Sequence, residues 1–251
     1  MSATRPYVLT IAGHDPSGGA GILSDIKTFE QHRVYGLAIT TGNTIQTENQ
    51  FYTIQWTDLD FVLDSIKKIF RTYDIKAVKI GIVPSLEYLK KIVSQIKKHS
   101  PRTKIIWDTV LKSTTEFEFT TVENKAELLK ILKKIDLITP NYSEILKLSD
   151  SKNSAEEIAH ELSSHCPVLL KGGHHPKQKG VDYLFMDEEC AKLVSTTVVT
   201  SEKHGSGCVL SSAITANIAL GHDFILSSMK AKKYIEKYLT SNTTLLGYHH
   251  V

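Results

Sequence analysis

The amino-acid sequence predicts a single α/β domain, residues 1–251, with a mostly parallel central sheet and helices on both faces of that sheet. Short apolar runs alternate along the chain with longer segments in which apolar residues recur at helical spacing. The 251 residues, 41% of them hydrophobic, are enough to bury a large core. We find no internal repeat and no linker rich in Pro, Gly or Ser that would divide the chain.

Strands are expected at the short apolar runs. The first run begins at Tyr7 and ends in Gly13, as a buried strand before a tight turn does. In chain order the runs are residues 7–13, 35–41, 77–83, 104–108, 136–139 and 167–171, with a late hairpin or edge pair at 181–185 and 193–200. Because these runs are apolar at consecutive positions, most of the strands should be covered on both faces.

Helices are expected between the strands, where apolar side chains fall on one helical face. Such stripes cover residues 59–70, 86–96, 128–135 and 158–162. Pro84 and Ser85 form a start signal for the second of them. Further helical patterns follow Gly21 and Gly207, and the last of these is rich in small residues that allow close helix packing.

Composition and charge exclude several classes of protein. Lys and Arg number 30 against 27 Asp and Glu, and a net charge of +3 is too small to predict a nucleic-acid or membrane-surface partner. Three widely spaced cysteines, Cys166, Cys190 and Cys208, form neither a disulfide framework nor a zinc motif. No apolar stretch is long enough to span a bilayer, and the first residues lack a signal-peptide pattern, so we expect a cytoplasmic protein.

Ligands of open α/β sheets bind beyond the carboxyl ends of the strands, so the residues there are the first candidates for a site. The first strand is followed by a glycine-rich turn, residues 13–21, that leads into a helix. Such a turn can present backbone N–H groups to an anion, although it is neither a Walker A loop nor a dinucleotide-binding fingerprint. A tight turn that only starts the helix is an equal alternative.

Three oxygen-bearing side chains follow later strands. Asp108 ends the fourth strand, and Asn141 and Glu144 stand three apart at a helix start after the fifth. Carboxylate and amide oxygens suit a Mg²⁺ ion that keeps several waters. The alternative is that Asp108 caps a turn and that Asn141 and Glu144 form a capping box, and both roles are compatible.

The segment from Lys203 to Cys208 is the most informative. Its glycine turn precedes a helix whose free N–H groups and macrodipole form an anion hole suited to phosphate charge. Cys208 falls in the first helical turn, where a thiol is expected to have a lowered pKa, although a buried, inert cysteine is the alternative. Lys171, before two glycines, can reach a phosphate, or it is an ordinary solvated lysine. Gln46 can pair with the edge of a heterocycle, or it is a surface residue.

Read together, these motifs resemble the hydroxymethylpyrimidine and phosphomethylpyrimidine kinases of thiamine biosynthesis, members of the ribokinase-like superfamily. The resemblance spans roughly residues 7–220 and keeps the family order of motifs. It is carried by residues 9–29, Lys79-Ile-Gly81, Asp108-Thr-Val110, Leu137 to Glu144, Lys171-Gly-Gly-His174 and His204-Gly-Ser-Gly-Cys208. Cys208 is the most diagnostic position, because most sugar kinases of the superfamily carry Asp there.

The resemblance implies a three-layer ribokinase-like fold and transfer of a phosphoryl group from ATP, with Mg²⁺, to a pyrimidine hydroxymethyl group and then to its monophosphate. By motif, Cys208 is the candidate base, and the N–H groups of Gly205, Ser206 and Gly207 form the anion hole. Lys171 would neutralise phosphate charge. The nucleotide would contact Lys171, Asn141 and Gly207.

The resemblance also implies a metal and a substrate set. Asp108, Asn141 and Glu144 would organise Mg²⁺, partly through water. The acceptor pocket would include Gly13, Asp25, Gln46 and Val110, so that the first glycine-rich turn serves the acceptor. The family also implies a homodimer.

Some positions depart from the family pattern. His14 stands where Ser or Thr is usual, Ile82 where Met is common, and residues 43–45 are less apolar than usual before Gln46. These changes surround the acceptor pocket, so pyridoxal kinase remains the near alternative. A non-catalytic binding module and a cysteine hydrolase are alternatives of other classes. Residues 114–123 and 177–180 are candidate lid loops.

Overall fold

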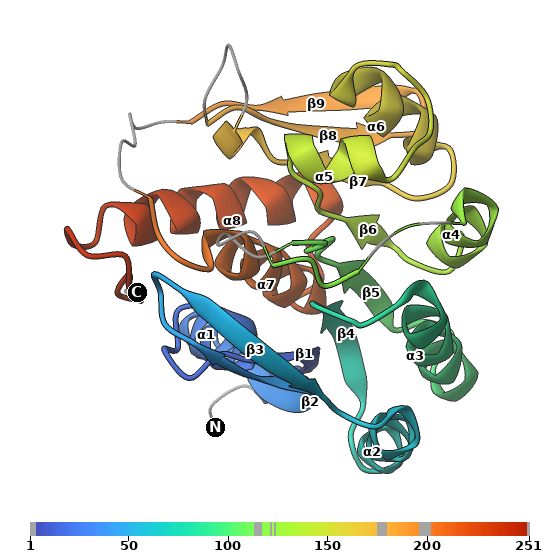
Figure 1. Ribbon diagram of the computed structural model, residues 1–251, viewed down its shortest axis with the longest axis vertical. Coiled ribbons are helices and arrows are strands. Elements are labelled where there is room, and N and C mark those ends of the chain that lie inside the picture. Colours follow the sequence, from blue (N-terminus) through green and yellow to red (C-terminus); the bar gives the residue numbers. More distant parts are fainter. Residues whose placement is uncertain are drawn as a thin grey trace.

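The computed structural model in Figure 1 describes residues 4–112, 117–120, 122, 124–174, 180–195 and 202–249. A nine-stranded sheet runs through these residues in the order β3-β2-β1-β4-β5-β6-β7-β8-β9. The strands β2, β1, β4, β5, β6 and β7 pair in parallel, whereas β3 at one margin and β8 and β9 at the other pair antiparallel. The strands are β1 (Tyr7–His14), β2 (Tyr35–Gln46), β3 (Phe51–Trp56), β4 (Ile75–Ile80), β5 (Lys104–Trp107), β6 (Leu137–Ile138), β7 (Val168–Leu170), β8 (Asp182–Met186) and β9 (Glu189–Leu193).

Helices cover both faces of the sheet, as the sequence predicts (Figure 1). Helices α2 (Leu59–Thr72), α3 (Leu86–His99), α4 (Lys125–Leu132) and α6 (Ala155–Ser163) bury apolar side chains on one face. On the other face lie α1 (Gly21–Gln31), α7 (Ser206–Ala219) and α8 (Phe224–Leu239). The remaining helices are the short α5 (Tyr142–Lys147) and the 3₁₀ turn η1 (Gly172–His174).

Strand residues alternate between the two cores. Ile105 packs in the core under α3, whereas its neighbour Ile106 packs against α7 and α8. Likewise, Val168 belongs to the same core as Ile105, and Leu169 belongs to the same core as Ile106. This arrangement confirms the predicted α/β fold class. In the part of the chain that the structure describes, no helix is both long and apolar enough to cross a membrane.

The two margins of the sheet differ from the sequence prediction. Strand β3 was not predicted. The edge strand that pairs with β8 is β9, over Glu189–Leu193, which lies earlier than the predicted run 193–200; residues 196–200 of that run lie outside the described residues. The chain reverses at once after Met186, where Asp187 adopts a φ of 54° in the left-handed region. The predicted lid loops fall largely outside the described residues, which omit 113–116, 121, 123 and 175–179.

Candidate functional site

Three glycine-bearing segments meet where β1 ends and α1 and α7 begin. Gly205 has a φ of +72°, and a Cβ at this position would lie 2.0 Å from the carbonyl oxygen of Gly19. Gly21 has a φ of +59°, and its Cβ would lie 2.2 Å from the carbonyl oxygen of Gly13. Both positions therefore require glycine, because only glycine combines this backbone conformation with so close an approach.

A hydrogen bond between two side chains joins the turn after β1 to the turn before α7. Nε2 of His204 lies 2.9 Å from Oδ2 of Asp15, which also accepts from the Ala20 N–H at 2.9 Å. Burial alone would raise the pKa of Asp15, but His204 and Ser17 outweigh it and hold the pKa below its ordinary value. The start of α7 is therefore tied to the turn after β1 by an ionised, buried carboxylate.

Asp108, at the end of β5, is fully buried and hydrogen-bonded on both oxygens. Its Oδ1 accepts from Lys171 at 2.9 Å and from Thr139 at 3.0 Å, and its Oδ2 accepts from Ser211 of α7 at 3.0 Å. Burial would raise the pKa of Asp108, but Lys171 and Lys79 lower it below its ordinary value. The predicted metal ligand is thus ionised and paired with the predicted phosphate-binding lysine.

Lys171 connects this carboxylate with the other predicted site residues. Its Nζ lies 3.9 Å from Oε2 of Glu144, and its backbone pairs in parallel with Asn141. A Cβ at Gly207 would lie 3.3 Å from the same Nζ, so the amine stands at the start of α7. The side chain is only 12% exposed, which excludes the alternative of a solvated lysine.

Asn141 and Glu144 form the capping box that the sequence allowed. The Oδ1 of Asn141 accepts from the Ser143 and Glu144 N–H groups, each at 2.9 Å, and Oε2 of Glu144 accepts from the Asn141 N–H at 2.8 Å. Burial raises the pKa of Glu144 to about 7, with Asp108 adding to the shift and Lys171 opposing it. The box starts α5 and holds the carboxylate beside Lys171.

The raised pKa of Glu144 predicts a pH-dependent stability. Between its ordinary pKa of 4.5 and its folded pKa of about 7, the folded state holds a proton that the unfolded state has lost. This contribution to stability is fully present below the lower value and is lost as the pH rises through the higher one. Without added metal, the free energy of unfolding should fall by about 2–3 kcal/mol more in the parent than in Glu144→Gln. Urea titrations across this range measure the difference, and parallel curves would contradict the prediction.

The predicted lowering of the Cys208 pKa is wrong. Burial raises the pKa of this thiol to about 11, and Asp108 and Asp25 add to the rise. Lys79 and a backbone contact from Gly21 oppose the rise without cancelling it. Desolvation and two nearby carboxylates therefore outweigh the helix N-terminus, and the thiol is neutral near pH 7.

One of the three backbone N–H groups predicted to form the anion hole already donates a hydrogen bond within the protein. The N–H of Ser206 donates to the Lys203 carbonyl at 3.2 Å. The first helical bond runs from the Val209 N–H to the Gly205 carbonyl at 3.0 Å. The N–H groups of Gly207 and Cys208 precede this bond and have no acceptor within the helix. They are donors available to an anion, together with the adjacent Lys171, and among the described residues the predicted N–H of Gly205 donates no hydrogen bond either.

The four predicted substrate residues differ from one another in burial and in their place in the fold. Gly13 is buried beside Ile82, Val110 is half-buried after β5, and Gln46 is half-buried at a β-bulge that ends β2. Asp25 is fully buried, so a direct contact with the substrate needs one of its present hydrogen bonds to be exchanged. These bonds come from Lys79, Thr10 and Ser212.

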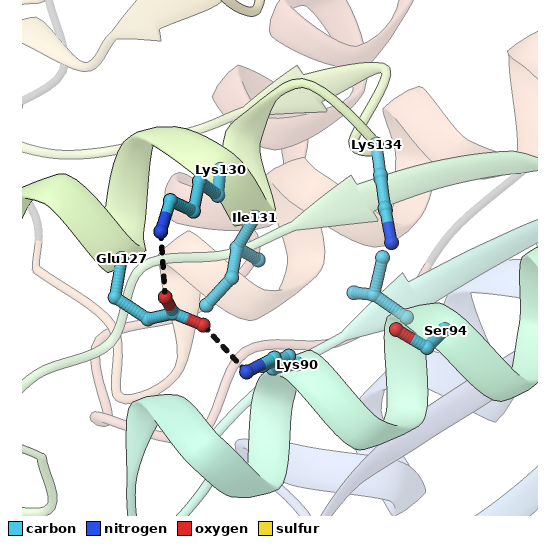
Figure 2. Close-up of a pocket in the computed structure, with 7 residues that line it drawn as sticks. Lys90, Ser94, Glu127, Lys130, Ile131 and Lys134 are labelled. Carbon is cyan, nitrogen blue, oxygen red and sulfur yellow. Dashed lines mark ion pairs between the residues drawn. The ribbon is translucent and has the colours of Figure 1, made fainter.

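Sequence reasoning missed the polar residues beneath the site, above all Lys79, Ser211 and Ser212. The one available signal was Lys79, the single charged residue of the predicted apolar run 77–83, because a charge there must be paired. A groove of about 220 Å³ between α3 and α4, shown in Figure 2, contains none of the predicted residues. Its Lys90 and Lys130 already pair with Glu127, at 2.8 and 3.8 Å.

Comparison with known proteins identifies the family of the chain. The family described as phosphomethylpyrimidine kinase matches residues 15–251. The chain is 34% identical to the hydroxymethylpyrimidine/phosphomethylpyrimidine kinase of Aquifex aeolicus over 94% of this chain and 95% of the relative. It is 29% identical to the enzyme of the same name from Escherichia coli, over 96% and 93% of the two chains.

Solved structures that share the fold include the following two enzymes. The phosphomethylpyrimidine kinase of Clostridium difficile superposes with a TM-score of 0.78 at 31% identity, covering 93% of this chain and 99% of that one. The pyridoxal kinase of Bacillus subtilis, solved as an ADP complex, has a TM-score of 0.80 at 27% identity, with coverages of 94% and 92%. The chain therefore belongs to the phosphomethylpyrimidine kinase family of phosphotransferases.

Proposed function

We propose that this protein phosphorylates the hydroxymethyl group of 4-amino-5-hydroxymethyl-2-methylpyrimidine with ATP, and then the resulting monophosphate. The observation that carries the proposal is the contact of Lys171 with Asp108, Glu144 and the start of α7. This places a buried cation, two carboxylates and two free N–H groups around one position. Phosphoryl transfer needs this combination, because its catalysis is mostly alignment and neutralisation of charge.

The residues divide the work by their chemistry. Lys171 and the N–H groups of Gly207 and Cys208 are proposed to receive the negative charge of the transferred phosphoryl group. Cys208 is proposed to take the proton of the acceptor hydroxyl, for which its neutral thiol must first ionise. A base contributes less than charge neutralisation in this reaction, which is compatible with a weakly acidic thiol at this position.

Mg²⁺ is proposed to accompany ATP, and the donors present fit it. Asp108, Asn141 and Glu144 offer only oxygen ligands, the type that Mg²⁺ prefers. Within the described residues, no group of three His, Cys, Asp or Glu side chains is arranged to hold a metal ion without other ligands. Asp108 and Asn141 are already hydrogen-bonded to protein groups, so these residues would hold the ion partly through water. When bound, Mg²⁺ supplies positive charge to the phosphates.

Pyridoxal is the second candidate substrate. The pyridoxal kinase of Bacillus subtilis shares the fold at 27% identity, and the departures at His14 and Ile82 surround the acceptor pocket. A non-catalytic binding module has less support, because a module without turnover needs no buried lysine between two carboxylates.

An ADP-release assay with Mg-ATP tests the proposal. Hydroxymethylpyrimidine, its monophosphate and pyridoxal are offered separately, and the products are identified by mass. We expect turnover of both pyrimidines. Turnover of pyridoxal alone would retain the reaction and change the substrate, and ATP binding without turnover of any would overturn the proposal.

A cytoplasmic homodimer completes the proposal. Three apolar side chains at the β2–β3 margin of the sheet are exposed, Tyr35 by 51%, Ile45 by 62% and Tyr52 by 56%. An exposed apolar sheet margin favours pairing with another copy of the chain. Light scattering compared with the chain mass of 28.0 kDa tests this state.

A further inference from the structure

Two buried carboxylates support α7 in the same way. Asp108 accepts from a lysine, a threonine and Ser211 of α7. Asp25 of α1 also accepts from a lysine, a threonine and a serine of α7. These donors are Lys79 at 2.5 Å, Thr10 at 2.6 Å and Ser212 at 2.6 Å. We refer to Asp25, Lys79, Thr10 and Ser212 as the Asp25 unit.

The two serines belong to the helix turn that carries the thiol. Ser211 and Ser212 stand three and four positions after Cys208, so all three lie on one side of α7. Ser211 also donates to the Cys208 carbonyl at 3.1 Å. The start of α7 is therefore hydrogen-bonded to two buried carboxylates. Ser211 bonds to Asp108 at the end of β5, and Ser212 bonds to Asp25 in α1.

The Asp25 unit cannot meet a ligand through Lys79. Lys79 and Asp25 are both 0% exposed, and Lys79 lies in β4, in the interior of the sheet. Replacing a buried ion pair with apolar side chains is often neutral or stabilising, so stability alone gives little reason for this pair. Lys79 lies close enough to Cys208 for the two groups to interact electrostatically, which gives the pair a connection to the site.

We infer that Lys79 is a positioning residue for Cys208, acting through Asp25 and Ser212 and through its own charge. The effect of this residue on catalysis rests on the proposed function, whereas its effect on the thiol does not. The hydrogen bonds of the unit fix the side of α7 that presents the thiol. The charge of Lys79 compensates Asp25, which would otherwise oppose ionisation of that thiol.

The electrostatics around the thiol agree with this role. Burial is the largest influence on the pKa of Cys208 and raises it, and among the side chains Lys79 is the strongest to lower it. Asp108 and Asp25 raise it, while Lys171 and Tyr238 also interact with the thiol. Although burial would lower the pKa of Lys79, Asp25 and the other anionic groups raise it above its ordinary value, so the amine stays charged.

The rate of alkylation of Cys208 by iodoacetamide tests the inference without requiring kinase activity. A Cys190→Ser background removes the exposed cysteine. Well below the thiol pKa, the rate is proportional to the thiolate fraction, and we expect Lys79→Met to lower it about tenfold at a pH of about 8.5. Lys76→Met is the matched control, because Lys76 lies in the same strand with its side chain 51% exposed, and its rate should not change.

Ser212→Ala removes the hydrogen bond between α7 and Asp25 without changing a charge, and so tests whether this bond positions Cys208. We expect kcat to fall about tenfold and the KM for ATP to stay within about twofold. An unchanged alkylation rate in folded Lys79→Met, together with an unchanged kcat in Ser212→Ala, overturns the inference. If no candidate substrate turns over, the proposed function fails, and the alkylation rates still decide the inference.

A second variant covers the case in which Lys79→Met does not fold. Asp25→Asn combined with Lys79→Met removes both charges and leaves no unpaired buried ion. Because Lys79 acts on the thiol more strongly than Asp25, alkylation should again be slower than in the parent. An equal or faster rate in the folded double variant overturns the inference.

Discussion

Replacing Cys208 with alanine should lower kcat about 10²-fold while ATP binding stays within about twofold. The thiol stands at the start of α7, where the proposal places the acceptor hydroxyl, and alanine removes the proton acceptor while leaving the free backbone N–H groups in place. Steady-state kinetics with the pyrimidine substrate and calorimetric titration with a nucleotide measure the two quantities separately.

Cys190→Ala is the matched control for this prediction. Cys190 is exposed on β9 and is not among the residues of the site, so its replacement should change neither quantity. An equal loss of kcat and of nucleotide affinity in Cys208→Ala would assign the thiol a structural role. A fully active Cys208→Ala would exclude it as the base.

Lys171→Met should lower kcat more than Cys208→Ala does, because it removes a positive charge from the site. It also leaves the buried Asp108 carboxylate without its closest cation. We expect kcat to fall about 10²–10³-fold, as for the loss of one donor to a developing anion. Since Asp108 is fully buried and loses its closest cation, the free energy of unfolding should fall by about 3–5 kcal/mol. Kinetics and urea unfolding measure the two effects.

Two further variants separate these effects. Asp108→Asn combined with Lys171→Met leaves no unpaired buried charge, so most of the stability should return and the activity should not. Lys147→Met is the control, because its side chain is 43% exposed and its pair with Glu118 is a surface ion pair. A Lys171→Met enzyme with full activity would contradict the proposed role.

The predicted fold was confirmed because its elements depend on local patterns. The apolar stripe of α3 and the runs of β1 and β4 are readable from the chain, and their order implies parallel pairing. Strand β3 was missed because it lies at the margin of the sheet, where none of its residues is buried and polar residues interrupt the apolar run. The bounds of β9 were wrong because a reversal at Asp187 depends on a backbone conformation that few non-glycine residues adopt.

Four neighbouring residues of the candidate site were predictable from the sequence, but their hydrogen bonds and ionisation were not. Asp108, Asn141, Glu144 and Lys171 follow strands or open helices, and parallel strands end at one edge of the sheet, so sequence order indicated that they meet. The bond from Ser206 to Lys203 and the burial of Asp25 could not be predicted, because each depends on how separate segments pack.

The sequence by itself determined the α/β class, the family and the identity of the chemical groups, because these depend on residue order and local spacing. Only the tertiary structure decided the ionisation of those groups. Cys208 has a raised pKa because folding shields it from water and surrounds it with the fully buried Asp25, Asp108 and Lys79 from distant parts of the chain. Desolvation and charge pairing act through space, so no local pattern reports them.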